Sequence, residues 1–224
     1  MAGHSVDEYL ETIYFLAFPI GEYRPDPGSS AAIASRVADM LGVSRASAGE
    51  MLKRLEAEGL VERGEHKEAL LTETGIERAE RVVRKHRLIE RMLTDFMGYT
   101  AAEAHVHADG LGDTFSEDMV DRIEEKLGHP DRCPHGWPVD PAFEQRENKE
   151  LAPLADVGTP AEIVRLAEHD GDLLHWFYEE GFVPGARVEL REAQPAAGQF
   201  KISLSGTERA IGEKAAAGLY VKLV

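Results

Sequence analysis

Two predicted helices joined by a three-residue turn, with two short strands directly after them, constrain the fold of this chain most strongly. The helices span residues 31–41 and 44–58, and Ser44 is the predicted N-cap of the second. Residues 60–64 and 67–75 follow, and each run contains a short apolar stretch typical of a strand. A pair of helices followed by a two-stranded hairpin indicates a winged helix-turn-helix.

The second helix of such a unit lies in the major groove of DNA. Its first turn carries Ser44, Arg45 and Ser47, which are small or basic and suit contacts to bases and phosphates. Lys53 and Arg54 lie further along the helix and suit phosphates. The alternative is a plain helical hairpin, which the adjacent wing disfavours. The predicted DNA-contacting residues are Arg36, Ser44, Arg45, Ser47, Lys53 and Arg54.

The whole pattern predicts a mainly α protein with small β parts. The predicted winged helix-turn-helix domain spans residues 1–75, and a helical domain follows over residues 76–140. Residues 141–151 are a predicted linker, and residues 152–224 form the predicted β domain.

Capping signals mark the ends of the predicted helices. Ser5, followed three residues later by Glu8, is a predicted capping box for a helix over residues 6–18. A long helix is predicted to begin with Thr74 as its cap and to end at Gly98.

The C-terminal part of the chain has a different pattern. Residues 160–181 predict one helix interrupted at Gly171. Around it lie the alternating runs RVELREAQ, QFKISLS and LYVKLV, separated by turn signals. Such runs are typical of a small β-barrel.

Acidic residues outnumber basic ones, 41 to 25, which gives a net charge of −16. This balance argues against a nucleic-acid partner for the whole surface, but it leaves room for a local basic face. The excess is concentrated in residues 99–150, with 13 acidic and 5 basic residues. Together with nine histidines, this acidity is as compatible with cation binding as with a solvated surface.

Membrane and secretory segments are not expected. No apolar run approaches the 18 residues of a membrane span, and the N-terminus lacks the basic and apolar regions of a secretory signal. Cys133 is the single cysteine and cannot form a disulfide within the chain. A reducing cytoplasm is therefore the expected location, with no membrane partner.

Histidine and carboxylate side chains recur at helical spacing in three segments. His86 and Glu90 are four residues apart and share a face of the long helix. Packing of the helices against one another could join the three sets, and imidazole with carboxylate binds first-row divalent metals. The alternative is a set of solvated helix faces. The candidate ligands are Glu8, Glu11, His86, Glu90, His105, Asp109 and Asp113.

The chain resembles the diphtheria-toxin-repressor and manganese-transport-regulator family of metal-dependent repressors. The segments that carry the resemblance are DEYLETIYFL, IASRVADMLGVSRASAGEMLKRLEAEGLV, LTETG, KHRLIERMLTDFMG, HPDRCPHGWPV and HDGDLLHWFYEEGFVPGARVEL. The resemblance implies a winged helix that binds operator DNA when a divalent metal orders the dimer. It also implies that the C-terminal domain is SH3-like.

The resemblance implies ligand roles for the candidate residues, with one departure. Glu8 and Glu11 match the ligand positions of the first helix, and the Glu-His pair of the family is replaced by Gly112 and Asp113. The extra histidine His107 is expected to lie on another face. A second site in longer members uses a side chain of the SH3-like domain, for which the candidates are Glu168, Asp170 and Asp172.

The loop HPDRCPHGWP contains His129, Cys133 and His135, which together look like a zinc site. The family has a similar loop without that role. Structural packing, with Cys133 as a small buried apolar residue, is therefore the favoured interpretation.

These features predict a repressor of metal uptake genes that responds to Mn²⁺, with Fe²⁺ second, and that acts as a homodimer on double-stranded DNA. Two alternatives remain open: a DNA-binding regulator that no longer senses metal, and a metal-dependent enzyme. The enzyme is disfavoured because no base or nucleophile stands apart from the ligands. The predicted dimer seam, which could instead be core within one chain, comprises Leu88, Met92, Ile123 and Leu127.

Overall fold

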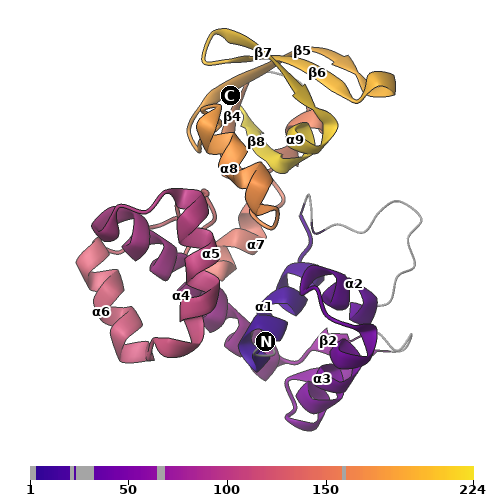
Figure 1. Cartoon of the computed structure of the whole chain (residues 1–224), viewed down its shortest axis with the longest axis vertical. Helices are drawn as coiled ribbons and strands as arrows, with labels where there is room; N and C mark the ends of the chain where they lie inside the picture. The colour runs from indigo at the N-terminus through magenta and orange to yellow at the C-terminus, as the bar shows by residue number, and fades with distance from the viewer. Residues whose placement is uncertain (1–3, 21–22, 24–32, 65–68, 158–159) are drawn as a thin grey trace.

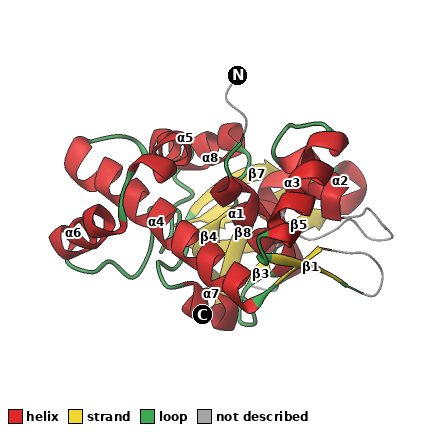
Figure 2. Ribbon diagram, turned by 90° about the horizontal axis from the view of Figure 1, so that it is seen from below, coloured by secondary structure: helices red, strands yellow, loops and turns green. Residues whose placement is uncertain are grey.

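The computed structural model describes residues 4–20, 23, 33–64, 69–157 and 160–224. The chain forms three lobes, with the N-terminal and central helices below and the C-terminal sheet above them (Figure 1). Figure 2 shows this sheet to one side of the central helices. In the residues that the structure describes, no helix is long and apolar enough to cross a membrane.

The N-terminal lobe is a winged helix-turn-helix. Ser5 and Glu8 form the predicted capping box at the start of its first helix, and Ser44 caps the third by accepting from the Ser47 N–H. The predicted segment 31–41 begins at Ile33 in the described part of the chain, and the tip of the wing, residues 65–68, lies outside it. The elements are α1 (Val6–Ala17), α2 (Ile33–Met40), α3 (Arg45–Ala57), β1 (Val61–Arg63) and β2 (Ala69–Leu71).

The central lobe is helical. The long helix begins earlier than predicted, because Thr72, and not Thr74, caps it by accepting from the Gly75 N–H. The helix ends at Gly98, whose φ of 75° is the left-handed conformation that glycine adopts readily. The elements are α4 (Glu73–Met97), α5 (Ala101–Leu111), the 3₁₀ turn η2 (Gly112–Thr114), α6 (Glu117–Leu127) and α7 (Pro141–Glu147).

The segment predicted as a linker therefore contains a short helix, α7. Asp140 caps it, and Pro141 occupies its first position, where a missing N–H costs nothing. Glu144 of this helix is 1% exposed and pairs with Arg87 of α4. The link between the lobes is thus a packed element.

The C-terminal lobe is a six-stranded antiparallel sheet with the order β3-β8-β4-β5-β6-β7. Buried Val188, Ile202 and Val221, on three of its strands, belong to one apolar core. The elements are β3 (Ala152–Pro153), η3 (Leu154–Asp156), β4 (Ala161–Leu166), α8 (Gly171–Glu179), β5 (Arg187–Gln194), η4 (Pro195–Ala197), β6 (Gln199–Leu204), β7 (Thr207–Gly212), α9 (Glu213–Gly218) and β8 (Leu219–Leu223).

The helix predicted over residues 160–181 is wrong in its first half. Residues 161–166 form strand β4, which pairs with β5 and β8, and only α8 is helical. Ala161 and Ile163 are buried while Glu162 and Val164 are half-buried, which is the alternation of a strand. β7 and α9 were not predicted.

The predicted dimer seam lies mostly inside the chain. Leu88 is fully buried and packs with Ile123 and Leu127 of α6, while Met92 packs on the core between α4 and α5. Leu88 therefore belongs to the core within one chain, whereas Met92, Ile123 and Leu127 are half-buried and their place in a dimer seam stays a prediction.

Candidate metal centre

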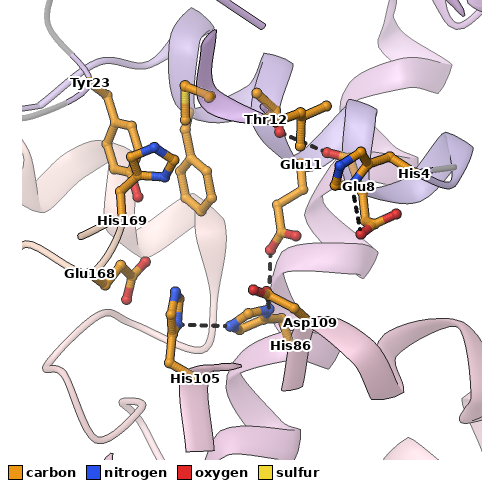
Figure 3. A pocket seen from close by; sticks show the side chains of 13 residues that line it. His4, Glu8, Glu11, Thr12, Tyr23, His86, His105, Asp109, Glu168 and His169 are labelled. Carbon is orange, nitrogen blue, oxygen red and sulfur yellow. Dashed lines mark hydrogen bonds and ion pairs between the residues drawn. The ribbon is translucent and has the colours of Figure 1, made fainter. Parts of the chain in front are cut away.

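Three helices bring histidine and carboxylate side chains to one place. Glu11 comes from α1, His86 and Glu90 come from one face of α4, and His105 and Asp109 come from one face of α5 (Figure 3). Helix α4 packs against both α1 and α5, which juxtaposes these faces. A cavity of about 190 Å³ lies among them, and residues of the N-terminal lobe line one side of it.

One donor set surrounds the Nδ1 side of His86. Its Nδ1 lies 3.3 Å from Asp109 Oδ1 and 3.6 Å from Glu11 Oε1. Donor atoms of His86, His105 and Asp109 all lie within 4.8 Å of one another. Two carboxylates and an imidazole on three helices form a set that a divalent ion could bridge.

Glu90 lies at the centre of the cluster and is completely buried. Its Oε1 is 2.7 Å from His105 Nδ1, 3.0 Å from His86 Nε2 and 3.3 Å from His135 Nδ1. Its Oε2 is buried and has no hydrogen-bond partner among the residues that the structure describes. A buried carboxylate oxygen without a partner is costly, so a cation beside it would satisfy it.

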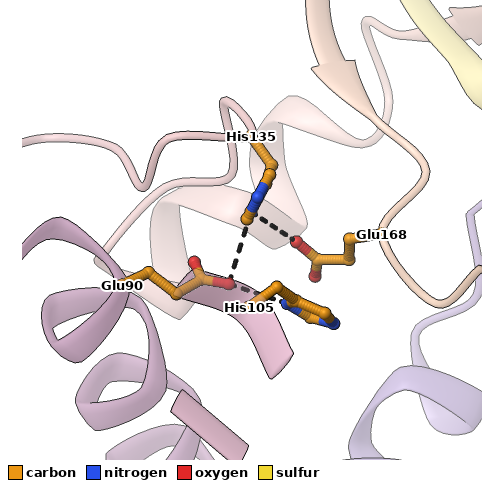
Figure 4. Close-up of side chains that lie close together, drawn as sticks. All are labelled: Glu90, His105, His135 and Glu168. Carbon is orange, nitrogen blue, oxygen red and sulfur yellow. Dashed lines mark hydrogen bonds and ion pairs between the residues drawn. The ribbon is translucent and has the colours of Figure 1, made fainter. Parts of the chain in front are cut away.

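A second donor set lies on the other side of Glu90. Glu90, His105, His135 and Glu168 converge from α4, α5, the loop after α6 and the segment after β4 (Figure 4). His135 Nδ1 is 3.6 Å from Glu168 Oε2. His135 Nε2 lies 3.1 Å from the Ala101 carbonyl, to which it can donate. When a cation is bound, that hydrogen bond would leave the Nδ1 lone pair available to the cation, as in many metal-binding histidines.

The charges in the cluster depend on one another. Burial raises the pKa of Glu168 to about 8, and the charge of Glu90 adds to this effect. Burial opposes ionisation of Glu90, but His135 and His86 hold its pKa well below the usual value. Burial likewise disfavours charged His86, yet Glu11 and Glu90 hold its pKa well above the usual value. A divalent cation would stabilise both carboxylates in their ionised form, so the donor set fits one.

Five of the seven predicted ligands belong to the two donor sets, and the other two, Glu8 and Asp113, line an adjoining pocket with Glu11, His86 and Asp109. Glu8 completes the capping box of α1: its Oε2 accepts from the Ser5 N–H at 2.5 Å, and its Oε1 is 3.1 Å from His4 Nδ1. Asp113 is exposed on the 3₁₀ turn after α5 and belongs to neither donor set. Gly112, beside it, has open space where a side chain would start.

Two members of the cluster were not among the predicted ligands. Glu168 was one of three candidates from the C-terminal domain. Asp170 instead caps α8, and Asp172 is exposed. For His135, the sequence favours a structural role in the packing of its loop, with a zinc site as the alternative interpretation. Cys133 is buried as expected, with its Sγ 3.7 Å from His135 Nδ1.

Two further histidines considered from the sequence, His129 and His107, lie outside the donor sets. His129 is exposed, its side chain 71% accessible, with Nδ1 3.9 Å from Glu124. His107 points away from the cluster and packs edge-on against Tyr99, as expected from its spacing.

The predicted DNA-contacting residues lie on the N-terminal lobe. The hydroxyl groups of Ser44 and Ser47 lie 2.9 Å apart at the start of α3, where Arg45 is also exposed. Later in α3, Lys53 pairs with Glu50, and Arg54 pairs with Glu58. On α2, a guanidinium nitrogen of Arg36 donates to the Tyr23 carbonyl, so this side chain is engaged within the protein.

Three families of known domains match the chain in sequence. Residues 1–69 match the iron dependent repressor N-terminal DNA binding domain, and residues 72–140 match the iron dependent repressor metal binding and dimerisation domain. Residues 153–223 match the FeoA domain. These matches agree with the winged helix-turn-helix, helical and SH3-like parts of the fold.

Whole proteins match as well. The iron-dependent repressor IdeR of Mycobacterium leprae is 30% identical over 218 residues, 91% of this chain and 90% of that protein. The diphtheria toxin repressor of Corynebacterium diphtheriae is 30% identical over 135 residues, 60% of this chain and 56% of that protein.

Solved structures show the same fold. A manganese-dependent transcriptional repressor in complex with manganese superposes with a TM-score of 0.84 and 28% identity, covering 98% of this chain and all of the other. The structure of ScaR with bound Zn²⁺ superposes with a TM-score of 0.79 and 26% identity, with the same coverage. The chain therefore belongs to the iron-dependent repressor family of metal-dependent transcriptional repressors.

Proposed function

We propose that this protein represses metal uptake genes by binding operator DNA as a homodimer when Mn²⁺, or second to it Fe²⁺, occupies the cluster around Glu90. The observation that carries this proposal is the buried Glu90 carboxylate, which meets three imidazoles and has one unpartnered oxygen among the described residues. Family membership makes repression the activity that the cluster would control.

Two adjacent sets of residues would hold the metal. Glu11, His86 and Asp109 form the first set. The second consists of Glu90, His105, His135 and Glu168. A bound divalent cation would neutralise their carboxylates and join α1 to the central and C-terminal lobes. Because α1 packs in the same core as α2 and α3, such a link would favour one orientation of the recognition helix.

The chemistry of the first set supports the preference for Mn²⁺. Glu11 and Asp109 supply two oxygen donors, while His86 and the neighbouring His105 supply borderline nitrogen, which accounts for Fe²⁺ as the second ion. Oxygen donors suit Mn²⁺, while thiolate or additional imidazole favours later metals. Replacement of Asp109 by cysteine should therefore shift the preference from Mn²⁺ toward Fe²⁺, as measured by the activating concentration of each ion.

The dimer contact that we propose uses apolar side chains that remain exposed on the central helices. Phe96 and Met97 at the end of α4 are 58% and 59% exposed, and Val106 on α5 is 62% exposed. Met119 at the start of α6 is also exposed. Large apolar side chains that remain exposed are candidates for an interface. Val106→Asp should give a monomer by light scattering, whereas an unchanged dimer would exclude this face.

DNA binding with and without metal tests the function. A random-sequence duplex library, selected on the purified full-length protein in Mn²⁺, supplies a DNA ligand whose affinity is then measured with chelator, Mn²⁺, Fe²⁺, Zn²⁺, Mg²⁺ or Ca²⁺. Affinity should rise at least about tenfold with Mn²⁺, within the usual range of allosteric coupling, and should not rise at the same concentration of Mg²⁺ or Ca²⁺. The control is His86→Ala, which should bind DNA equally in Mn²⁺ and in chelator.

Equal affinity in chelator and in Mn²⁺ would contradict the proposal and leave the alternative of a regulator that no longer senses metal. A response to Fe²⁺ without any response to Mn²⁺ would overturn the ligand-chemistry argument alone. The alternative of a metal-dependent enzyme is not retained, because the relatives are repressors.

A further inference from the structure

Trp137 lies where the three lobes of the molecule meet, and it is fully buried. Its ring centroid lies 6.3 Å from that of Phe15 on α1 and 5.8 Å from that of Tyr220 on β8. The guanidinium carbon of Arg87 on α4 lies 5.6 Å from the same ring. One side chain therefore contacts the DNA-binding, central and C-terminal lobes.

A buried ionic network holds this ring. The guanidinium carbons of Arg87 and Arg165 both lie within cation–π distance of it, at 5.6 and 4.9 Å. Arg87 pairs with Glu144 at 2.6 Å, and Arg165 pairs with Glu147 at 2.5 Å. Both carboxylates belong to α7, so this helix ties α4 to β4 around the indole.

Trp137 also fixes the loop that carries His135. Its indole N–H donates to the Leu166 carbonyl at 2.9 Å, and the Leu166 N–H donates to the His135 carbonyl at 3.0 Å. The Cys133 N–H donates to the Trp137 carbonyl at 2.8 Å. Because His135 is two residues before Trp137, the position of the ring sets where this imidazole stands in the second donor set.

On the opposite side, the contacts continue into the helix-turn-helix. Phe15, one turn after Glu11 on α1, stacks on Tyr23 with centroids 4.7 Å apart and an angle of 9° between the rings. Tyr23 also contacts the edge of Trp137, at 6.2 Å, and its carbonyl accepts a hydrogen bond from Arg36 of α2. An unbroken series of contacts thus joins the metal loop to α2.

We propose that Trp137 is a positioning residue that couples occupancy of the metal centre to the orientation of the helix-turn-helix. The inference rests on the proposed function. The indole holds His135 on one side and packs against Phe15 and Tyr23 on the other. Metal binding that draws His135 toward Glu90 and Glu168 therefore acts on the DNA-binding lobe through this ring. In a purely structural role, Trp137 would only stabilise the fold.

The test compares Trp137→Ala and Trp137→Phe with the matched control Trp176→Phe. Trp176 is the other tryptophan of the chain, half-buried in the C-terminal lobe and stacked on Phe182. For each full-length variant, Mn²⁺ binding is measured by calorimetry. DNA affinity is measured in chelator and in Mn²⁺ on the same selected duplex, and folding is checked by thermal melting.

Trp137→Ala should bind DNA in chelator as the wild type does and should keep the Mn²⁺ affinity of the first donor set within about threefold. It should lose at least about tenfold of the gain in DNA affinity that Mn²⁺ gives. Trp137→Phe retains an aromatic ring without the N–H donor and should recover part of this gain. Trp176→Phe should match the wild type.

A Trp137→Ala protein that gains as much DNA affinity from Mn²⁺ as the wild type would overturn the inference. If Trp137→Ala lowered DNA affinity equally in chelator and in Mn²⁺, the role of Trp137 would be structural, and this result would also overturn the inference. If the alanine variant does not fold, the same comparison of DNA affinity in Mn²⁺ and in chelator is made with Trp137→Phe, and the same outcomes support or overturn the inference. The wild-type protein tests the proposed function by itself: if its DNA affinity is the same in Mn²⁺ and in chelator, the proposed function is wrong. The inference, which rests on that function, is then wrong as well.

Fluorescence gives a second readout without any change at Trp137. In Trp176→Phe, Trp137 is the only remaining tryptophan, and its emission should change as Mn²⁺ binds, at the concentration that activates DNA binding. Emission that does not change across that range would show that the ring does not respond to the metal centre, against the proposal.

Discussion

A single carboxylate, Glu90, determines most of the chemistry of the cluster. His86 and Glu90 four residues apart on a helix are an ordinary pair, and such pairs are usually solvated. Here the Glu90 side chain points inward and is fully buried, where His105 and His135 also reach it. The ligand types were predictable from the sequence. The burial of Glu90 was not, because it depends on how the C-terminal lobe, which contributes Glu168, packs against the central helices.

Replacement of Glu90 by glutamine should remove the charge that holds the three imidazoles together. We expect Mn²⁺ affinity to fall by more than about tenfold at both donor sets. The second set loses a charged ligand, and the first loses the carboxylate that orients His86. Calorimetric titration of the purified variant measures this. Glu103→Gln, at an exposed capping position on α5, is the matched control and should bind like the wild type. Unchanged metal binding in Glu90→Gln would remove Glu90 from the centre.

Glu8 and Glu11 should differ in their roles although both were predicted as ligands. Glu8 belongs to the capping box of α1, whereas Glu11 Oε1 lies 3.6 Å from His86 Nδ1. Glu11→Gln should abolish the Mn²⁺-dependent gain in DNA affinity. Glu8→Gln should keep that gain and lower the free energy of unfolding by less than about 1 kcal/mol, because a glutamine oxygen can also accept from the Ser5 N–H in a capping box. Urea unfolding and DNA titration separate the two, and an equal loss of metal response in both variants would return Glu8 to the ligand set.

At the scale of the elements, local signals gave the right answer where a helix end depends on its own residues. The capping box of α1 and the Ser44 cap of α3 are examples. Local reasoning failed where pairing partners distant in sequence decide the structure. Residues 161–166 have a composition compatible with a helix or a strand. They form a strand because β5 and β8 pair with them on either side. Likewise, α7 was read as a linker because its burial against Arg87 depends on the tertiary fold.

Gly136 shows how closely the metal loop approaches strand β4. Its φ is +88°, and a Cβ at this position would lie 2.0 Å from the carbonyl oxygen of Val164. Gly136→Ala should lower the free energy of unfolding by about 2–4 kcal/mol through backbone strain and overpacking. It should also weaken Mn²⁺ binding at the second donor set, because His135 adjoins the displaced backbone.

The matched control for this change is Gly112→Ala. Its Cβ would meet nothing within 4 Å, and its φ of −51° suits any residue. Its stability by urea unfolding should stay within about 1 kcal/mol of the wild type. An equal free energy of unfolding for Gly136→Ala and Gly112→Ala would show that the backbone at Gly136 does not pack closely against the Val164 carbonyl.

At the scale of the whole molecule, the metal centre is an interdomain feature. Its side chains come from α1, α4, α5, the loop before α7 and the segment after β4. Helical spacing within one segment can be predicted, but the meeting of His135 with Glu168 requires the central and C-terminal lobes to be in place. The overall charge of −16 is similarly uninformative about the DNA face, because the proposed contacts occupy one short helix.

The excess acid should nevertheless limit DNA affinity at one identifiable position. Glu50 is exposed on α3 and holds Lys53 at 2.7 Å, so it opposes phosphate binding both by its own charge and by engaging that ammonium. Glu50→Gln should raise affinity for the selected duplex several-fold at low salt and make the slope of log K against log salt steeper by up to about one. The gain should shrink as salt rises, because screening removes interactions between exposed charges. Glu125→Gln, an exposed acid on α6, changes the net charge equally and should leave DNA affinity unchanged. If both variants gain equally, net charge rather than position governs binding, and α3 loses its assignment as the DNA-contacting helix.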